Sequence, residues 1–265
     1  MGKLVARSTH RIMCGSSTDA DSVTALLAGA TPYLMVTDPP YGVNYDADWR
    51  NHSFRPDGTA MSSRAIGKVE NDDRADWREA WALFPGDVAY IWHAGAHSPT
   101  VAESLHSVGF ETRNLIIWAK NHMVIGRGHY HHKHEPCWYM VRKGATGHWQ
   151  GDRTQTTLWD IDKPQRSETG HSTQKPLECM KKPMINNSEE GDSVYEPFSG
   201  SGTTLVAGEQ CGRHVYAMEI NPPYVDLAVQ RFQQAFKKDA YMEGTGKKFQ
   251  DVAAERGITV MPWQQ

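Results

Sequence analysis

The chain lacks the long apolar runs and paired cysteines that mark membrane or secreted proteins. No apolar run reaches the roughly 18 to 20 residues that a helix needs to span a bilayer. The first 11 residues carry basic side chains but no apolar stretch of signal-peptide length. The four cysteines lie 123, 42 and 32 residues apart, so CxxC zinc and redox motifs are absent. We therefore expect reduced thiols, no membrane partner and a cytoplasmic location.

An excess of charge of one sign is also missing. The 28 basic and 31 acidic residues give a formal net charge of −3, which excludes a histone-like polycation. Any nucleic acid must therefore be bound by a local basic patch. With 39% hydrophobic and 22% charged residues in 265 positions, the composition predicts a folded globule with a full core.

Short apolar, β-prone runs alternate with helical patterns along the chain. The first helix is expected to be capped by Ser17 or Thr18 and to end at Pro32. Strands are expected at 11–14, 33–37, 88–92, 114–118, 193–195 and 215–218. This alternation predicts an α/β fold with a mostly parallel sheet and helices on both faces.

A glycine-rich turn in the second half has the surroundings of a nucleotide site. A strand ends at Glu196-Pro197-Phe198, and Ser199-Gly200-Ser201-Gly202 leads into a helix. Glycines let the backbone approach a ligand beside a helix N-terminus. Glu219, nineteen residues after Gly200, ends the next strand, where an acid accepts hydrogen bonds from ribose hydroxyls. Without GK[ST] or a third glycine, a P-loop is excluded and a mononucleoside-like cofactor is favoured over a dinucleotide.

The first half contains groups suited to activating an amine on a planar base. Asp38-Pro39-Pro40-Tyr41 follows a buried strand, so it sits at the carboxyl edge of the sheet, where α/β folds bind ligands. The Asp38 carboxylate and the next backbone carbonyl can each accept a hydrogen bond from an amino group. Tyr41 can stack on the base. Two acceptors aim the lone pair of the amine at an electrophile.

Four segments in this order resemble the β class of amino-methylating DNA methyltransferases. The catalytic motif precedes the cofactor motif, which marks that class, and the resemblance covers about residues 11–235. An aspartate at the start of the tetrapeptide is typical of adenine-N6 enzymes, whereas cytosine-N4 enzymes usually carry serine. The matching segments are Thr37–Gly42, His171–Pro176, Glu196–Thr204 and Gly212–Pro222.

The resemblance implies a Rossmann-like methyltransferase fold, S-adenosyl-L-methionine as cofactor and double-stranded DNA as substrate, with the target adenine flipped out of the duplex. Its catalytic residues would be Asp38, Pro39, Pro40 and Tyr41. The cofactor would be held by Phe198, Gly200, Gly202, Thr203 and Glu219, with Thr173 and Lys175 near its methionine end.

Two positions depart from the family pattern. The family usually has aspartate where Glu196 stands, a change that we expect to be tolerated. A Gly-Asp pair that often lies near the cofactor adenine is replaced by Gly15-Ser16, so that contact is not assigned.

The resemblance predicts a single methyltransferase domain over 1–265. It would comprise a catalytic-motif half (11–125), an inserted target-recognition segment (126–170), a cofactor-binding half (171–235) and a surface tail (236–265). The recognition segment is basic and aromatic, and Arg127 and Lys133 are its candidate DNA contacts. Its histidine cluster, 129–134, fits no zinc spacing, so a surface loop or a DNA-facing loop is favoured over a metal site. The polar stretch 46–76 is a solvated loop or a lid.

Several alternatives stay open. The same chemistry could act on cytosine N4 or on RNA, or the chain could be an inactive module that binds DNA and cofactor. Intact Asp38 and Tyr41 argue against the inactive module. A homodimer is possible. The setting could be bacterial, with or without a restriction partner, or a phage protein in a host cytoplasm.

Overall fold

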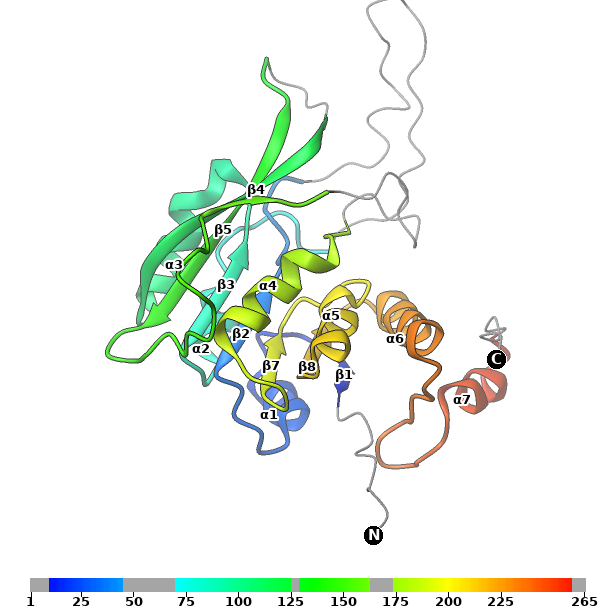
Figure 1. Ribbon diagram of the computed structural model, residues 1–265. Coiled ribbons are helices and arrows are strands. Elements are labelled where there is room, and N and C mark those ends of the chain that lie inside the picture. The colour runs from blue at the N-terminus through cyan, green and yellow to red at the C-terminus, as the bar shows by residue number, and fades with distance from the viewer. Residues whose placement is uncertain (1–9, 45–69, 125–128, 163–173, 259–265) are drawn as a thin grey trace, which may run out of the picture.

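The computed structural model describes residues 10–44, 70–124, 129–162 and 174–258. These residues build an eight-stranded sheet in the order β1-β8-β7-β2-β3-β5-β4-β6 (Figure 1). Neighbouring strands are parallel except where β5 pairs with β3 and with β4, so the expected mostly parallel α/β fold is confirmed. The strands are β1 (Arg11–Cys14), β2 (Leu34–Thr37), β3 (Val88–Trp92), β4 (Phe110–Val124), β5 (His132–Arg142), β6 (Leu158–Asp160), β7 (Ser193–Glu196) and β8 (His214–Glu219).

Helices cover both faces of the sheet (Figure 1). One apolar core joins the sheet to α4, α5 and α6, and a second joins its other face to α1, α2 and α3. The bounds are α1 (Ala20–Leu27), α2 (Arg78–Ala82), α3 (Ser98–Ser107), α4 (Leu177–Asn187), α5 (Thr203–Cys211), α6 (Pro222–Phe236) and α7 (Phe249–Glu255). In the described part of the chain, no helix is long and apolar enough to cross a membrane.

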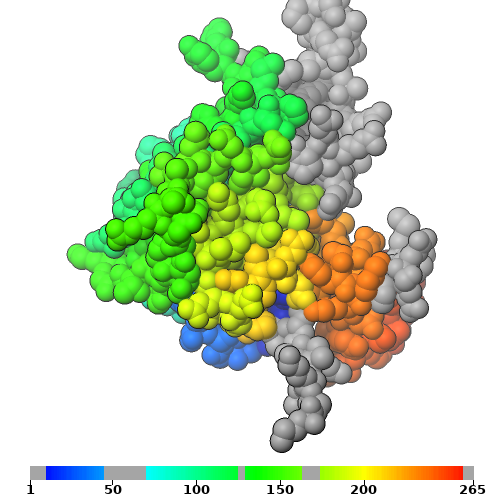
Figure 2. All heavy atoms as spheres, in the orientation of Figure 1, coloured from blue at the N-terminus to red at the C-terminus, as the bar shows by residue number. Residues whose placement is uncertain are grey.

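Strand β5 lies inside the sheet, between β3 and β4. Its residues Cys137, Met140 and Val141 are fully buried, so they belong to the core. The predicted recognition segment 126–170 therefore contributes two strands, β5 and β6, to the main sheet. Strand β4 is longer than the predicted 114–118 and forms an antiparallel hairpin with β5, and the outer end of this hairpin projects beyond the body of the protein (Figures 1 and 2).

The sheet gathers the chain's functional motifs at one edge. Strands β1, β8, β7, β2 and β3 run parallel, so their carboxyl ends meet at the same edge. Strand β4 is antiparallel to β5, which is antiparallel to β3, so β4 also ends at this edge. The projecting hairpin therefore rises from this edge next to the carboxyl end of β3, the neighbour of β2.

The start and end of the first helix were predicted wrongly. Asp19, whose carboxylate accepts a hydrogen bond from the Ser22 amide, caps α1 in place of Ser17 or Thr18. The helix ends at Leu27 because Ala28 adopts a left-handed conformation, with φ of 47°. Most of the predicted loop or lid, 46–76, lies outside the described residues.

Candidate active site

The Asp38-Pro39-Pro40-Tyr41 tetrapeptide leaves the sheet directly after β2. Proline has no amide hydrogen for the ladder, so the strand ends before Asp38. Gly42 then adopts a φ of +73°, and a Cβ at this position would lie 2.8 Å from the Arg74 backbone. The turn is therefore packed against a second stretch of backbone, which fixes the tetrapeptide at the carboxyl edge.

The two carboxylate oxygens of Asp38 have different environments. Oδ1 accepts hydrogen bonds from Lys175 Nζ and from the Tyr41 hydroxyl, both at 2.7 Å. Oδ2 accepts none from any residue that the structure describes. The Asp38 side chain is 23% exposed, so a donor from outside the protein can reach this carboxylate.

The proline carbonyls that follow Asp38 also differ. The indole N–H of Trp77 donates to the Pro40 carbonyl at 3.1 Å. The Pro39 carbonyl has no such partner within the described ranges. Asp38 Oδ2 and the Pro39 carbonyl therefore offer two acceptors on adjacent residues, as the sequence predicts for an amine site.

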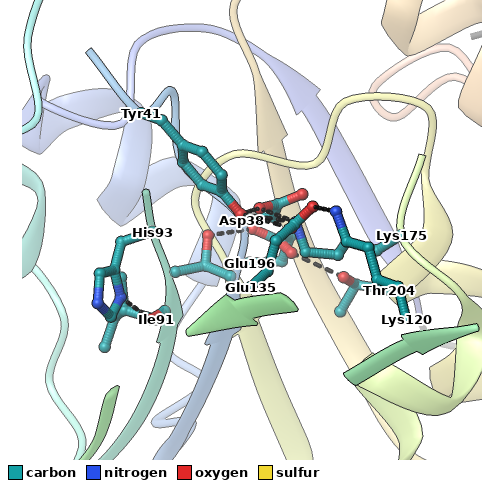
Figure 3. A network of polar contacts seen from close by, with 10 residues as sticks. Asp38, Tyr41, Ile91, His93, Lys120, Glu135, Lys175, Glu196 and Thr204 are labelled. Carbon is teal, nitrogen blue, oxygen red and sulfur yellow. Dashed lines mark hydrogen bonds and ion pairs between the residues drawn. The ribbon is translucent and has the colours of Figure 1, made fainter. Parts of the chain in front are cut away.

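Four charged side chains meet behind the tetrapeptide, and we call Asp38, Lys120, Glu135 and Lys175 the charge cluster (Figure 3). Lys175 Nζ contacts Asp38 Oδ1 at 2.7 Å and Glu135 Oε2 at 2.8 Å. Lys120 Nζ pairs with the other oxygen of Glu135. The two lysine side chains are 4% and 5% exposed, and their charges are balanced by the two carboxylates.

Burial and ion pairing act against each other in this cluster. Burial raises the pKa of Asp38 above its ordinary value, although the Lys175 ammonium works in the opposite direction. Burial would also raise the pKa of Glu135, but Lys175 and Lys120 outweigh it and lower that pKa to about 2. Burial disfavours the charged form of Lys175, yet Asp38 and Glu135 hold its pKa above the usual range. Lys175 and Glu135 are therefore charged near neutral pH.

The glycine-rich turn follows β7, the strand next to β2. Gly200 has φ of +51°, and a Cβ there would meet nothing within 4 Å. Gly202 has φ of +80°, and a Cβ there would lie 2.7 Å from the Cβ of Ala228 on α6. Gly200 thus leaves its backbone open to a ligand, whereas Gly202 is required by close packing. Thr203 begins α5 and is buried.

Phe198 lies between the glycine-rich turn and α2. Its half-buried ring packs edge-on against Trp77 and Trp81 at centroid distances of 4.8 and 5.8 Å. Trp77 is also the residue that donates to the Pro40 carbonyl, so one indole joins the cofactor turn to the tetrapeptide.

Glu219 ends β8 and reaches back to the glycine-rich turn. Its Oε2 accepts the Gly200 amide and its Oε1 accepts the Asn221 amide, both at 2.8 Å. Burial raises the pKa of Glu219, and the backbone donors oppose this effect. Each oxygen keeps a further lone pair, so the carboxylate can still accept a hydrogen bond from a ligand hydroxyl.

These residues fit S-adenosyl-L-methionine, which the resemblance implies. The open space at Gly200 gives a ligand access to the backbone at the start of α5. A carboxylate acceptor, Glu219, lies across the turn, and the aromatic Phe198 flanks it. Ser199 Oγ is buried and has no hydrogen-bond partner in the described part of the chain. The turn thus has room and acceptor groups for a nucleoside.

The structure brings together most of the predicted site residues, but it places Lys175 on the catalytic side. The Lys175 ammonium contacts Asp38 and Tyr41, at 2.7 and 2.6 Å, while its predicted role beside the cofactor stays a prediction. Lys133 is exposed on β5 in the projecting hairpin. Thr173 and Arg127 lie outside the described residues.

Glu135 and Lys120 belong to the site but were not singled out from the sequence. Each is a charged residue within an otherwise apolar strand segment, since Trp118 precedes Lys120 by two positions and Cys137 follows Glu135 by two. A charge on the inward side of a buried strand needs a partner, and that pattern was the available signal. The partner could not be named without the strand order.

The histidine cluster lies on the projecting hairpin. Residues 129–134 are exposed, with the Tyr130 ring 91% accessible. Among the residues that the structure describes, no group of three or more His, Cys, Asp or Glu side chains is arranged to hold a metal ion. A DNA-facing role for this cluster stays a prediction.

A family profile described as DNA methylase, of the N6/N4 methyltransferases, matches residues 33–230. This chain belongs to the DNA methylase family. The match includes the tetrapeptide, the charge cluster, the glycine-rich turn and Glu219.

Individual relatives are distant but match most of the chain. The Type II methyltransferase M2.MboI of Moraxella bovis is 23% identical over 76% of this chain and 80% of its own length. The chain spans 62% and 63% of two longer Type II methyltransferases. Among solved structures, the M1.HpyAVI–SAM complex matches with a TM-score of 0.61 and 22% identity over 83% of this chain and 98% of that one. The cytosine-N4-specific PvuII DNA methyltransferase matches with a TM-score of 0.60 and 17% identity over 85% and 86%.

Family membership makes the enzyme class and the cofactor clear. The protein is a DNA methyltransferase of the amino-methylating type, and S-adenosyl-L-methionine is its methyl donor. The family model covers both N6 and N4 methyltransferases, so membership alone does not identify the target base.

Proposed function

We propose that this protein methylates the N6 amine of an adenine in double-stranded DNA. The observation that supports the proposal is a pair of acceptors with no partner among the described residues, Asp38 Oδ2 and the Pro39 carbonyl, at the carboxyl edge of β2. An exocyclic amine has two N–H donors, and this pair can accept both. S-adenosyl-L-methionine, when bound, supplies an electrophilic methyl group.

The acceptors make the amine a better nucleophile by fixing its geometry. The nitrogen lone pair of adenine N6 is delocalised into the ring, so the free amine is planar and weakly nucleophilic. Hydrogen bonds from both N–H groups to Asp38 and Pro39 favour a pyramidal nitrogen whose lone pair points away from them. The transfer then proceeds by direct displacement, without a covalent intermediate on the protein.

The order of strands puts the two halves of this reaction beside each other. Asp38 follows β2 and the glycine-rich turn follows β7, and the two strands pair in the sheet. In our proposal Phe198, Gly200, Gly202, Thr203 and Glu219 line the cofactor side, and Glu219 accepts from the ribose hydroxyls. The adenine enters as a flipped nucleotide, because a stacked base cannot reach the carboxyl edge of the sheet. Tyr41 stacks on its ring.

Adenine is favoured over cytosine by the aspartate at position 38. In the family that the motifs resemble, cytosine-N4 enzymes usually carry serine at this position. The cytosine-N4-specific PvuII enzyme is only 17% identical to this chain, so its likeness concerns the fold and not the target base.

The base is identified by analysis of the product. DNA from cells that express the protein is digested to nucleosides and analysed by mass spectrometry, with the Asp38→Ala variant as the control. We expect N6-methyldeoxyadenosine with the wild-type protein and its loss with the variant. N4-methyldeoxycytidine in its place would overturn the adenine assignment, and methylated RNA without methylated DNA would overturn the substrate.

A further inference from the structure

The ammonium group of Lys175 has an acceptor for each of its three hydrogens. It donates to Asp38 Oδ1 at 2.7 Å, to the Tyr41 hydroxyl at 2.6 Å and to Glu135 Oε2 at 2.8 Å. A lysine ammonium has three N–H donors and no acceptor, so its hydrogen bonding is complete. Because the side chain is 5% exposed, water does not compete for these positions. The ammonium is therefore fixed in one orientation.

Glu135 connects this ammonium to the projecting hairpin. One Glu135 oxygen binds Lys175 and the other binds Lys120. Glu135 lies on β5 opposite Trp118 of β4, two positions from Lys120. The charge cluster thus extends from the hairpin to the turn after β2, and each charge in it lies next to an opposite one (Figure 3).

The distribution of hydrogen bonds on Asp38 is unequal. Lys175 and Tyr41 both bind Oδ1, which leaves Oδ2 without a partner among the described residues. A carboxylate can rotate about its Cβ–Cγ bond, so its two oxygens are interchangeable unless one is held. Two donors on the same oxygen remove that freedom.

We propose that Lys175 is a positioning residue for Asp38, which holds Oδ1 so that Oδ2 faces the target amine. Glu135, itself held by Lys120, fixes the Lys175 ammonium in that place. This role differs from the place beside the methionine end of the cofactor that the resemblance implies for Lys175. It rests on the proposed function, because it requires Asp38 to accept a hydrogen bond from the amine.

A second effect of Lys175 is electrostatic. Burial raises the pKa of Asp38, and the neighbouring ammonium counteracts this effect. Asp38 must be ionised to accept from the amine, so activity falls as the pH drops below its pKa. Removing the ammonium raises that pKa further, and the acid limb of the rate profile moves to higher pH. The other titratable groups facing this site are Tyr41, His93, Lys120, Glu135, Cys137, Cys179 and Glu196.

The Lys175→Met variant tests the proposal. We expect kcat to fall by about 100-fold, the loss typical of a misplaced catalytic group, and the acid limb of kcat to move to higher pH. The dissociation constants for S-adenosyl-L-methionine and DNA should stay within about threefold, since neither is held by Lys175. Lys181→Met, which removes a lysine from an exposed ion pair on the same side of the protein, is the matched control. A loss of cofactor affinity equal to the loss of activity would overturn the proposal, as would an unchanged kcat.

If the Lys175→Met variant does not fold, Tyr41→Phe provides a second test, because this smaller change should leave the fold intact. It keeps the ring that stacks on the base but removes one of the two donors on Asp38 Oδ1. We expect kcat to fall about tenfold and its acid limb to move to higher pH, with both dissociation constants unchanged. An unchanged kcat and pH profile would contradict the proposed role of Oδ1.

The contribution of Glu135 is tested by charge-balanced variants. Glu135→Met, which leaves no oxygen at this position, should lower kcat about tenfold, and Lys120→Met added to it should not restore the rate, because Lys175 still lacks its third acceptor. Recovery in the double variant would show that Glu135 only neutralises Lys120, and it would overturn this part of the proposal. Glu111→Gln, which removes an exposed carboxylate from β4, is the control.

These measurements separate the further inference from the proposed function. If the wild-type protein produced N4-methyldeoxycytidine, the adenine assignment would fail. The variants could still be compared on that product, and kcat and its pH profile would decide whether Lys175 positions Asp38.

Discussion

In the proposed chemistry a single oxygen of Asp38 accepts the hydrogen bond from the amine. This arrangement predicts the effect of removing the Asp38 carboxylate. In Asp38→Ala both the acceptor for the amine and a partner of Lys175 are lost. We expect methyl transfer to be abolished while the affinity for S-adenosyl-L-methionine stays within about tenfold, since the cofactor side lies on β7 and β8. Parallel activity assays and calorimetric titrations check this, with Asp21→Ala on α1 as an exposed control. Equal losses of activity and cofactor affinity would place Asp38 in the wrong site.

Glu219 is expected to act on binding and not on the chemical step. Its carboxylate accepts two backbone amides and in our proposal also a ribose hydroxyl. Glu219→Ala should weaken cofactor binding by about 1.5 to 3 kcal/mol, the range for a hydrogen bond to a charged group. The variant should stay folded, because Glu219 lies at the end of a strand and is not part of the apolar core. Isothermal titration that shows unchanged affinity would refute the ribose role.

At the scale of single residues, the sequence predicts a functional residue where its neighbours along the chain form a recognisable pattern. Asp38 and Tyr41 stand out because two prolines end a buried strand there, and Gly200 stands out because a strand and a helix flank it. Glu135 and Lys120 have no such local signature. Their role depends on antiparallel pairing across the hairpin and on Lys175, so it follows from tertiary structure alone.

Among the secondary-structure elements, β2, β7 and α5 are joined by one buried carboxyl group. Glu196 at the end of β7 binds the Thr37 hydroxyl of β2 at 2.5 Å and the Thr204 hydroxyl of α5 at 2.7 Å. It also accepts the Phe198 amide at 3.0 Å. Here the family usually has an aspartate, and the longer glutamate still connects the catalytic and cofactor motifs.

The buried position of Glu196 gives the protein a pH-dependent stability. Burial raises its pKa from 4.5 to about 8, despite the hydrogen bonds that oppose this shift. Between these two pH values the folded state holds a proton that the unfolded state has lost, so the folded state loses stability as the pH rises. Glu196→Gln does not titrate, and its stability relative to wild type should rise by roughly 2 to 4 kcal/mol from pH 5 to pH 9.

Urea unfolding of both proteins at several pH values measures this difference. Glu111→Gln, which removes an exposed carboxylate, is the reference for effects of net charge. Stability curves of wild type and Glu196→Gln that run parallel from pH 5 to pH 9 would contradict the prediction.

The element boundaries were predictable where the apolar pattern coincides with the strand. Strand β3 at Val88–Trp92 matches its prediction because all five residues are buried. Strand β4 was predicted too short, because polar side chains occur among its first residues and its last residues face outward. The apolar pattern therefore covers only the middle of the strand. Pairing with β5 satisfies their backbone groups, and the partners, which lie between 8 residues (Val124 with His132) and 32 residues (Phe110 with Arg142) away, are invisible to a local pattern.

For the whole molecule, the projecting hairpin is the candidate DNA contact that the structure describes. Lys133 is exposed on its outer part, and the hairpin rises from the same edge as Asp38. Basic side chains at such a position mostly bind phosphates and carry little sequence information.

Lys133→Gln should therefore weaken binding to all DNA sequences alike. We expect a roughly two- to tenfold loss of affinity and a salt dependence whose slope is lower by about 1, with the same adenines methylated. Lys143→Gln, at the opposite end of β5, is the matched control. Fluorescence anisotropy at several salt concentrations and sequencing of methylated bases provide the measurements. A changed methylation motif would show instead that Lys133 reads bases.

The pairing of β2 with β7 also sets when the enzyme becomes complete during its synthesis. Thr37 and Glu196 touch across 159 residues of sequence, so the strand carrying the catalytic motif leaves the ribosome long before its neighbour. At about 5 to 20 residues per second, this interval is on the order of 10 to 30 s. Until it has passed, β2 lacks one of its two neighbours and the cofactor turn does not exist. The growing chain therefore cannot complete its active site before β7 and β8 have been translated.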